Sequence, residues 1–97
     1  MQIVSNKNEL IRSGNEIVDL SREYEQKIKE IKEIIERMRQ YWKGQDADTF
    51  QNMINEKCIP ALEQIRQKIE NFGNYIKQVP IIYETFEKNT VDSVKKG

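Results

Sequence analysis

The side chains that could perform covalent chemistry in this 97-residue chain are few and scattered. Serine occurs at positions 5, 13, 21 and 93, Cys58 is the only cysteine, and histidine is absent. The chain therefore lacks the most common general base and the most common metal ligand. A nucleophile also needs a base within hydrogen-bonding reach, and nothing in the spacing brings one to a serine. We predict no enzymatic activity, no catalytic residue, no metal site and no cofactor.

Charge and hydropathy exclude further classes of partner. Sixteen basic and sixteen acidic side chains cancel, and neither half of the chain is a polycation, so a phosphate-binding surface has no electrostatic basis. No glycine-rich phosphate loop is present, and no stretch approaches the ~20 apolar residues of a membrane span. Residues 1–6 lack the basic start and apolar middle of a cleavable signal peptide. We predict no nucleic-acid partner and no small-molecule substrate.

The elements that position the remaining side chains follow from hydrophobic periodicity. A run from Leu10 to Trp42 alternates steps of three and four residues, and a similar run extends from Ala47 to Phe86. Gly44 lies between them, where a chain reversal needs a positive φ or a tight approach. The pattern predicts an all-α antiparallel two-helix hairpin. Its first helix spans about 6–41, its turn 42–45 and its second helix about 46–88.

The second helix carries signals of a start, of bends and of an end. Asp46 is a suitable N-cap directly after the glycine turn. Pro60 and Pro80 each remove a helix hydrogen bond, but the apolar phase continues past both, which predicts kinks near them within one helix of a single domain. A break at Gly73, giving a third short helix, is the alternative. The tail, residues 89–97, is short and polar and is predicted to fray.

The two runs have more apolar side chains than one hairpin can bury. Residues such as Ile11, Val18 and Ile34 widen the stripe and would stay in water on an isolated hairpin. A second hairpin packed on the first would cover them, which predicts a dimeric four-helix bundle. The predicted hairpin and dimer seam consists of Ile17, Tyr24, Ile28, Ile31, Ile35, Met38, Phe50, Ile54, Ile65, Ile69, Phe72 and Ile76.

Three small side chains lie on these seams. Cys58 falls on the apolar face of the second helix, and we expect it to be a small buried side chain. Gly14 and Ser21 lie on the seam of the first helix. They either allow the helices to approach closely or are tolerated variation near a helix end.

Two motifs together resemble those of a known family. Trp42-x-Gly44 lies almost at the midpoint of the chain, with Ala47 and Phe50 in the first turns of the next helix. This arrangement resembles the WXG family, the small early-secreted-antigen-like substrates of type VII secretion. The second mark of that family is Tyr-x-x-x-Asp/Glu near the C-terminus, and the chain has tyrosine and glutamate at positions 83 and 87. The resemblance covers nearly the whole chain.

The resemblance implies a function for both motifs. Trp42 and Gly44 would form the turn and export motif, and Tyr83 and Glu87 the C-terminal secretion signal, one turn apart on one helical face. The protein would be made and folded in the bacterial cytoplasm and secreted without a cleavable signal peptide. It would pair with itself as a homodimer or with a related small helical protein as a heterodimer. A membrane-bound type VII secretion ATPase would recognise it.

Some alternatives remain open from the sequence. The chain is an adaptor or targeting chaperone if it pairs with the helical N-terminal domain of a larger secreted effector, or it is a plain structural coiled-coil module. Trp42 either covers the bend and packs near Phe50, or stays partly exposed at the end of the bundle. The chain is rich in Ile, Lys, Glu and Asn where the family is often rich in alanine, which leaves its partner undecided.

Overall fold

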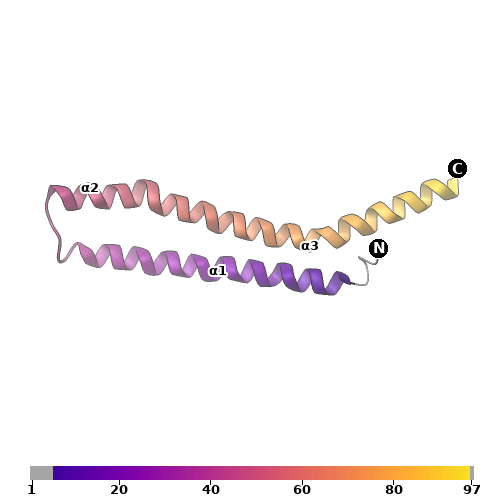
Figure 1. Cartoon of the computed structure of the whole chain (residues 1–97), viewed down its shortest axis with the longest axis horizontal. Coiled ribbons are helices and arrows are strands. Elements are labelled where there is room, and N and C mark those ends of the chain that lie inside the picture. Colours follow the sequence, from indigo (N-terminus) through magenta and orange to yellow (C-terminus); the bar gives the residue numbers. More distant parts are fainter. Residues whose placement is uncertain (1–5, 97) are drawn as a thin grey trace. The chain divides into compact units, whose positions relative to one another are not determined.

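The computed structural model describes residues 6–96, with side chains through Phe86 and at Lys88, and shows an all-α chain (Figure 1). The helices are α1 (Lys7–Met38), α2 (Gln45–Met53), the π-helical segment η2 (Ile54–Cys58) and α3 (Ile59–Lys96). No strand occurs in residues 6–96. The predicted all-α helical hairpin is therefore confirmed, whereas the dimeric bundle remains a prediction.

The chain divides into two compact units. We call residues 20–69 the turn unit, and residues 1–19 together with 70–97 the terminal unit. In each unit a segment of α1 runs antiparallel to a segment from the second half of the chain.

The turn unit is held by a small apolar core and by ion pairs at its edge. Ile28 is only 1% exposed, and Ala47 and Ile59 are also buried. At the edge, the Glu63 carboxylate contacts Lys32 Nζ at 3.6 Å and Arg66 Nε at 3.5 Å. Because these charged groups are partly solvated, each pair adds little stability, and the apolar core supplies most of it.

The terminal unit contains a close approach between two helix backbones. A Cβ atom on Gly73 would stand 2.8 Å from the carbonyl oxygen of Gly14 and 2.9 Å from the backbone nitrogen of Val18. A Cβ atom on Gly14 would clash with the Lys77 side chain and stand 2.7 Å from the Gly73 carbonyl oxygen. Gly14 therefore serves close approach, one of its two predicted roles. α3 passes through Gly73 without a break.

The segment η2 changes which side chains the second half of the chain buries. The backbone N–H of Ile59 donates to the carbonyl oxygen of Ile54, five residues earlier, as in a π-helix. Pro60 follows directly and has no N–H to donate to this stretch of helix. Since the five-residue step carries the buried face from Ile54 to Ile59, Cys58 turns outward. The prediction of a buried Cys58 is wrong: its side chain is exposed.

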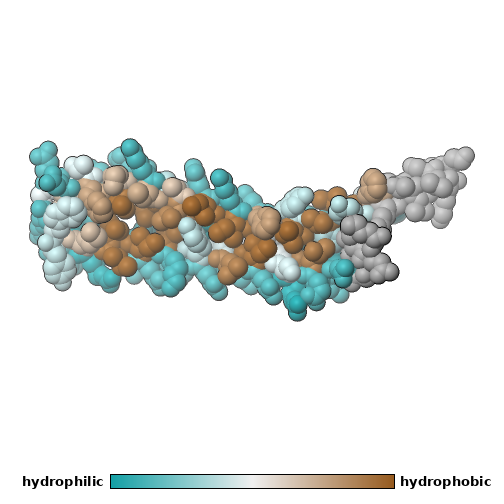
Figure 2. Space-filling model, viewed as in Figure 1, coloured by the Kyte–Doolittle hydropathy of each residue, from teal (hydrophilic) through white to brown (hydrophobic). Residues whose placement is uncertain are grey.

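The turn unit also exposes apolar side chains to solvent. Leu20, Ile31 and Ile34 are exposed on α1, and Met53 and Ile65 are exposed on the segment that pairs with it. The three on α1 are 11 and 3 residues apart, which places them on one side of the helix. Figure 2 shows hydrophobic side chains gathered over both paired segments and bordered by hydrophilic ones. The single helix pair therefore leaves apolar surface in water, as the width of the stripe predicts for Ile34, whereas the same prediction for Val18 is wrong because Val18 is buried in the terminal unit.

Candidate functional site

The turn begins where the hydrogen bonding of α1 changes at its C-terminus. Arg39 donates to the Glu36 carbonyl at 3.2 Å and Gln40 to the Arg37 carbonyl at 3.0 Å, both three residues back. The backbone nitrogens of residues 41 and 42 both donate to the Met38 carbonyl, at 3.1 and 2.9 Å. Short three-residue steps of this kind commonly close a helix end, because its last four carbonyls have no donors within the helix.

Gly44 closes the turn and caps α2. Its φ of 118° and ψ of −178° lie in a region that is essentially restricted to glycine. An added Cβ would meet no atom within 4 Å, so the backbone angle and not a lack of space requires glycine here. Of the two reasons for a glycine that the sequence left open, a positive φ or a tight approach, the structure shows the first. The predicted Asp46 cap is wrong, because the N-cap is Gly44, whose carbonyl accepts the first helical bond from Asp48 at 3.0 Å.

Trp42 combines the two environments predicted for it. Its ring centroid lies 5.3 Å from that of Phe50, with the planes tilted by 48°, a favourable aromatic geometry. The residue is nevertheless 42% exposed. Trp42 thus packs against the first turns of α2 with one part of its ring and presents the rest to solvent.

A buried glutamine joins the two sides of the turn. Gln51 Nε2 donates to the carbonyl oxygen of Ile35 at 3.0 Å, across the hairpin. Gln51 itself is buried, one residue after the Phe50 ring that Trp42 contacts. The sequence reasoning missed this residue. The available signal was a polar side chain within the apolar stripe of the second helix, directly after Phe50.

The C-terminal motif lies in the terminal unit. Tyr83 is 43% exposed on α3. The next residue, Glu84, contacts Lys7 Nζ at 3.2 Å and so links this part of α3 to the start of α1. The Glu87 side chain lies outside the described residues, so its predicted pairing with Tyr83 remains a prediction.

The predicted seam residues differ widely in exposure. Exposure alone does not divide the seam between the hairpin and a dimer contact, so that assignment remains a prediction. Ile28 is buried; Ile17, Tyr24, Ile35, Met38, Phe50, Ile54, Ile69 and Ile76 are half-buried; and Ile31, Ile65 and Phe72 are exposed.

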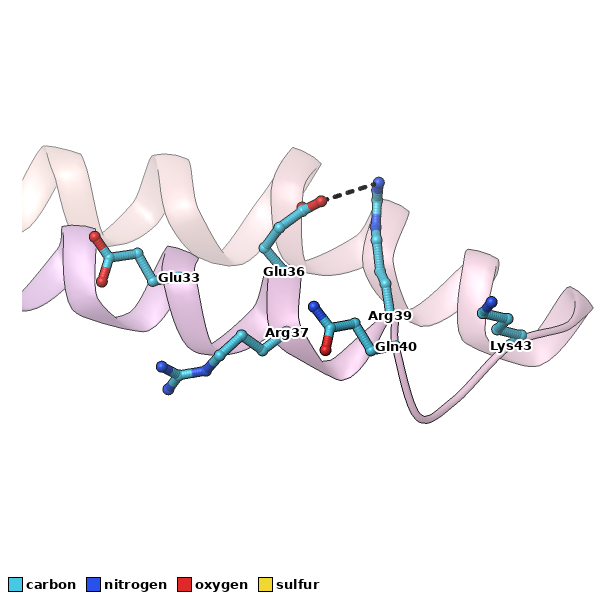
Figure 3. Close-up of a pocket in the computed structure, with 6 residues that line it drawn as sticks. All are labelled: Glu33, Glu36, Arg37, Arg39, Gln40 and Lys43. Carbon is cyan, nitrogen blue, oxygen red and sulfur yellow. Dashed lines mark ion pairs between the residues drawn. The ribbon is translucent and has the colours of Figure 1, made fainter.

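A polar hollow near the turn offers no convergent chemistry (Figure 3). Its lining side chains are all exposed and point in different directions, and Glu36 and Arg39 form an ion pair of 3.7 Å. Among the described side chains, no group of histidine, cysteine, aspartate or glutamate could hold a metal ion. None of the helices described is both long and apolar enough to cross a bilayer. The hollow is lined by Glu33, Glu36, Arg37, Arg39, Gln40 and Lys43.

Comparison with models of known protein families gives a match. A family model described as WXG100, proteins of 100 residues with WXG, matches residues 2–88. Neither the curated proteins nor the solved structures gave a match. The matched range includes the turn around Trp42 and the C-terminal tyrosine and glutamate at positions 83 and 87.

Proposed function

Because the chain belongs to the WXG100 family of small helical proteins secreted by type VII systems, we propose that it is exported as a dimeric helical module with a two-part signal. Trp42 and Gly44 form one part, and Tyr83 and Glu87 form the other. Members of this family typically form dimers with themselves or with relatives and are not known as enzymes. The membrane-bound ATPase of the secretion system recognises this signal.

The exposed, fixed ring of Trp42 carries the proposal. A tryptophan that served only to cover a helix corner would be largely buried, because tryptophan is highly buried on average, whereas Trp42 falls among the exposed large apolar residues. Here 42% of Trp42 stays exposed, and the Phe50 ring contacts the indole and restrains it. The Gly44 backbone sets the direction in which the chain passes from Trp42 into α2. A restrained, exposed aromatic side chain suits recognition, because little rotamer entropy is lost when a receptor binds it.

The apolar surface supports the dimer. Ile31, Ile34 and Ile65 are exposed in the turn unit, and large apolar groups of this kind are favoured in the cores of obligate interfaces. A second hairpin would remove them from water in a four-helix bundle. The partner is a second copy or a related small helical protein. Light scattering at micromolar concentration should report a dimer, and a stable monomer would contradict this part of the proposal.

Export from the native host tests the signal. We expect Trp42→Ala to abolish secretion, and likewise Tyr83→Ala combined with Glu87→Ala. We expect the double variant to stay within about ±0.5 kcal/mol of the parent in stability, because Tyr83 is exposed and substitutions at exposed positions rarely do more. Tyr41→Ala, at an exposed aromatic residue beside the motif, is the matched control and should be secreted normally.

Melting curves decide how a secretion defect is interpreted. Loss of export in a variant that still melts like the parent supports a recognition role. Normal export of the Tyr83→Ala, Glu87→Ala double variant would remove the C-terminal signal from the proposal. A secretion defect in Trp42→Ala that only matches its loss of folded protein would make Trp42 a structural residue.

A further inference from the structure

Gln51 is a polar side chain in an apolar contact. It is 5% exposed, close to Ala47, which is also buried on α2. Burying an amide is unfavourable unless its hydrogen-bonding groups find partners. The bond from Nε2 to the Ile35 carbonyl, at 3.0 Å, supplies one. A leucine or methionine would fill the same space without that requirement, so the amide needs an explanation beyond packing.

The bond adds a side-chain donor to the hydrogen bonding at the end of α1. The last four carbonyls of this helix belong to residues 35–38. Those of Glu36, Arg37 and Met38 accept backbone N–H groups from residues 39–42. The carbonyl of Ile35 accepts the Gln51 side chain. Each of these four carbonyls thus accepts at least one hydrogen bond, and the bond to Ile35 comes from a side chain of the opposite helix.

We propose that Gln51 is a positioning residue for Trp42. Its side chain holds the end of α1 at Ile35, while the adjacent residue, Phe50, holds the Trp42 ring. Two consecutive residues of α2 therefore fix both the place where the chain leaves α1 and the direction of the indole. This inference rests on the proposed export role of Trp42.

The chemistry of the glutamine amide matches this task. An aliphatic side chain of similar volume would fill the contact but would remove the donor that reaches the partly buried Ile35 carbonyl from the opposite helix. Glutamate in its ionised form accepts hydrogen bonds only, so it would place a carboxylate against a carbonyl oxygen. Asparagine has the same amide on a side chain that is one methylene shorter, so its nitrogen would fall short of the Ile35 carbonyl.

Gln51→Met tests the inference in the purified protein. We expect amide exchange at residues 39–42 to become roughly tenfold faster, the change expected when a hydrogen bond to a buried group is lost. Fluorescence reports on Trp42 alone, because it is the only tryptophan, and acrylamide quenching should rise. Gln64→Met applies the same substitution to an exposed glutamine of the turn unit and should change neither signal.

Exchange elsewhere separates positioning from general destabilisation. A purely structural role would accelerate exchange throughout the turn unit, including around Ile28, and would leave quenching of the folded state unchanged. Local acceleration at residues 39–42 with increased quenching supports the proposal. Parent-like exchange and quenching in folded Gln51→Met would overturn it.

Secretion of the same variants separates this inference from the proposed function. If Trp42→Ala blocks export and folded Gln51→Met reduces it several-fold, positioning by Gln51 contributes to the signal. If Trp42→Ala blocks export but Gln51→Met is secreted like Gln64→Met, the export signal stands and the positioning role in export is overturned. If Trp42→Ala is secreted normally, the proposed function fails, whereas exchange and quenching still decide whether Gln51 fixes the turn.

Discussion

The terminal unit and the turn unit both pair two helical segments, but different atoms meet at the contact. In the terminal unit the backbones themselves approach at Gly14 and Gly73, where no Cβ would fit. In the turn unit the contact contains the side chains of Ile28 and Ile59, and the Gln51 amide bonds to a backbone carbonyl. Where two helices meet through their backbones, an added side-chain atom destabilises the contact. Where they meet through side chains, the loss of side-chain atoms destabilises it.

Glycine illustrates the difference most directly. Gly73 has an ordinary helical backbone but no room for a side chain. Gly44 has ample room but a φ of 118° that side-chain-bearing L-residues rarely adopt. The same residue type is thus required by packing in one unit and by backbone conformation in the other.

Loss of side-chain volume from the turn unit should have the largest effect. Ile28→Ala removes a fully buried side chain and should reduce the free energy of unfolding by about 2–5 kcal/mol. Ile31, with 38% exposure and one turn further along α1, is the matched control. Denaturant melts at concentrations where the protein is monomeric should show a much smaller loss for Ile31→Ala. Equal losses would mean that the exposed flank of α1 is as important to the monomer as the buried one.

Addition of one carbon to the terminal unit should have the next largest effect. In Gly73→Ala the new Cβ meets the Gly14 carbonyl and the Val18 backbone, which cannot move aside as a flexible side chain can. Overpacking at such a site costs about 3 kcal/mol, which exceeds the roughly 1 kcal/mol that alanine gains over glycine in helix propensity. Ser13→Ala, at an exposed position of α1, should be nearly neutral. A stabilised Gly73→Ala protein would show that the two backbones do not touch.

The sequence predicted the features that depend on local pattern. Hydrophobic periodicity identified the helical hairpin, and the position of Gly44 between two periodic runs identified a turn that needs either a positive φ or a tight approach, of which the structure shows the positive φ. Trp42 and Phe50 meet, which is one of the two environments predicted for Trp42. Each of these inferences needs only neighbouring residues and the geometry of a helix.

Features that depend on register across the hairpin were not predictable in this way. From the sequence alone, Gly73 is only a residue of low helix propensity. Its packing role becomes visible once it is known to contact Gly14, even though both glycines lie 29 residues from the Lys43-Gly44 pair. Gln51 donates to a backbone carbonyl. Because every residue has such a carbonyl, the residue types do not indicate which one accepts the bond. The exposure of Cys58 depends on the additional residue in η2. There the backbone N–H groups donate five residues back and not four, and the sequence pattern does not distinguish these two hydrogen-bonding patterns.

The smallest expected effect, at Gly44, separates conformational strain from steric clash through chirality. Gly44→Ala should reduce the free energy of unfolding by about 1 kcal/mol, because an L-residue at this φ and ψ is strained by about 2 kcal/mol even where space is open, and restriction of the unfolded chain offsets part of that strain. The mirror image of φ 118° and ψ −178° is an ordinary extended conformation, so D-alanine introduced at position 44 by chemical synthesis should be unstrained. It should also restrict the unfolded chain, which makes the D-alanine protein as stable as the parent or slightly more stable. Chemical melts of the two epimers provide the measurement. Equal destabilisation by both would show that atoms near Gly44, and not its backbone angles, require glycine, and the contrast with Gly73 would disappear.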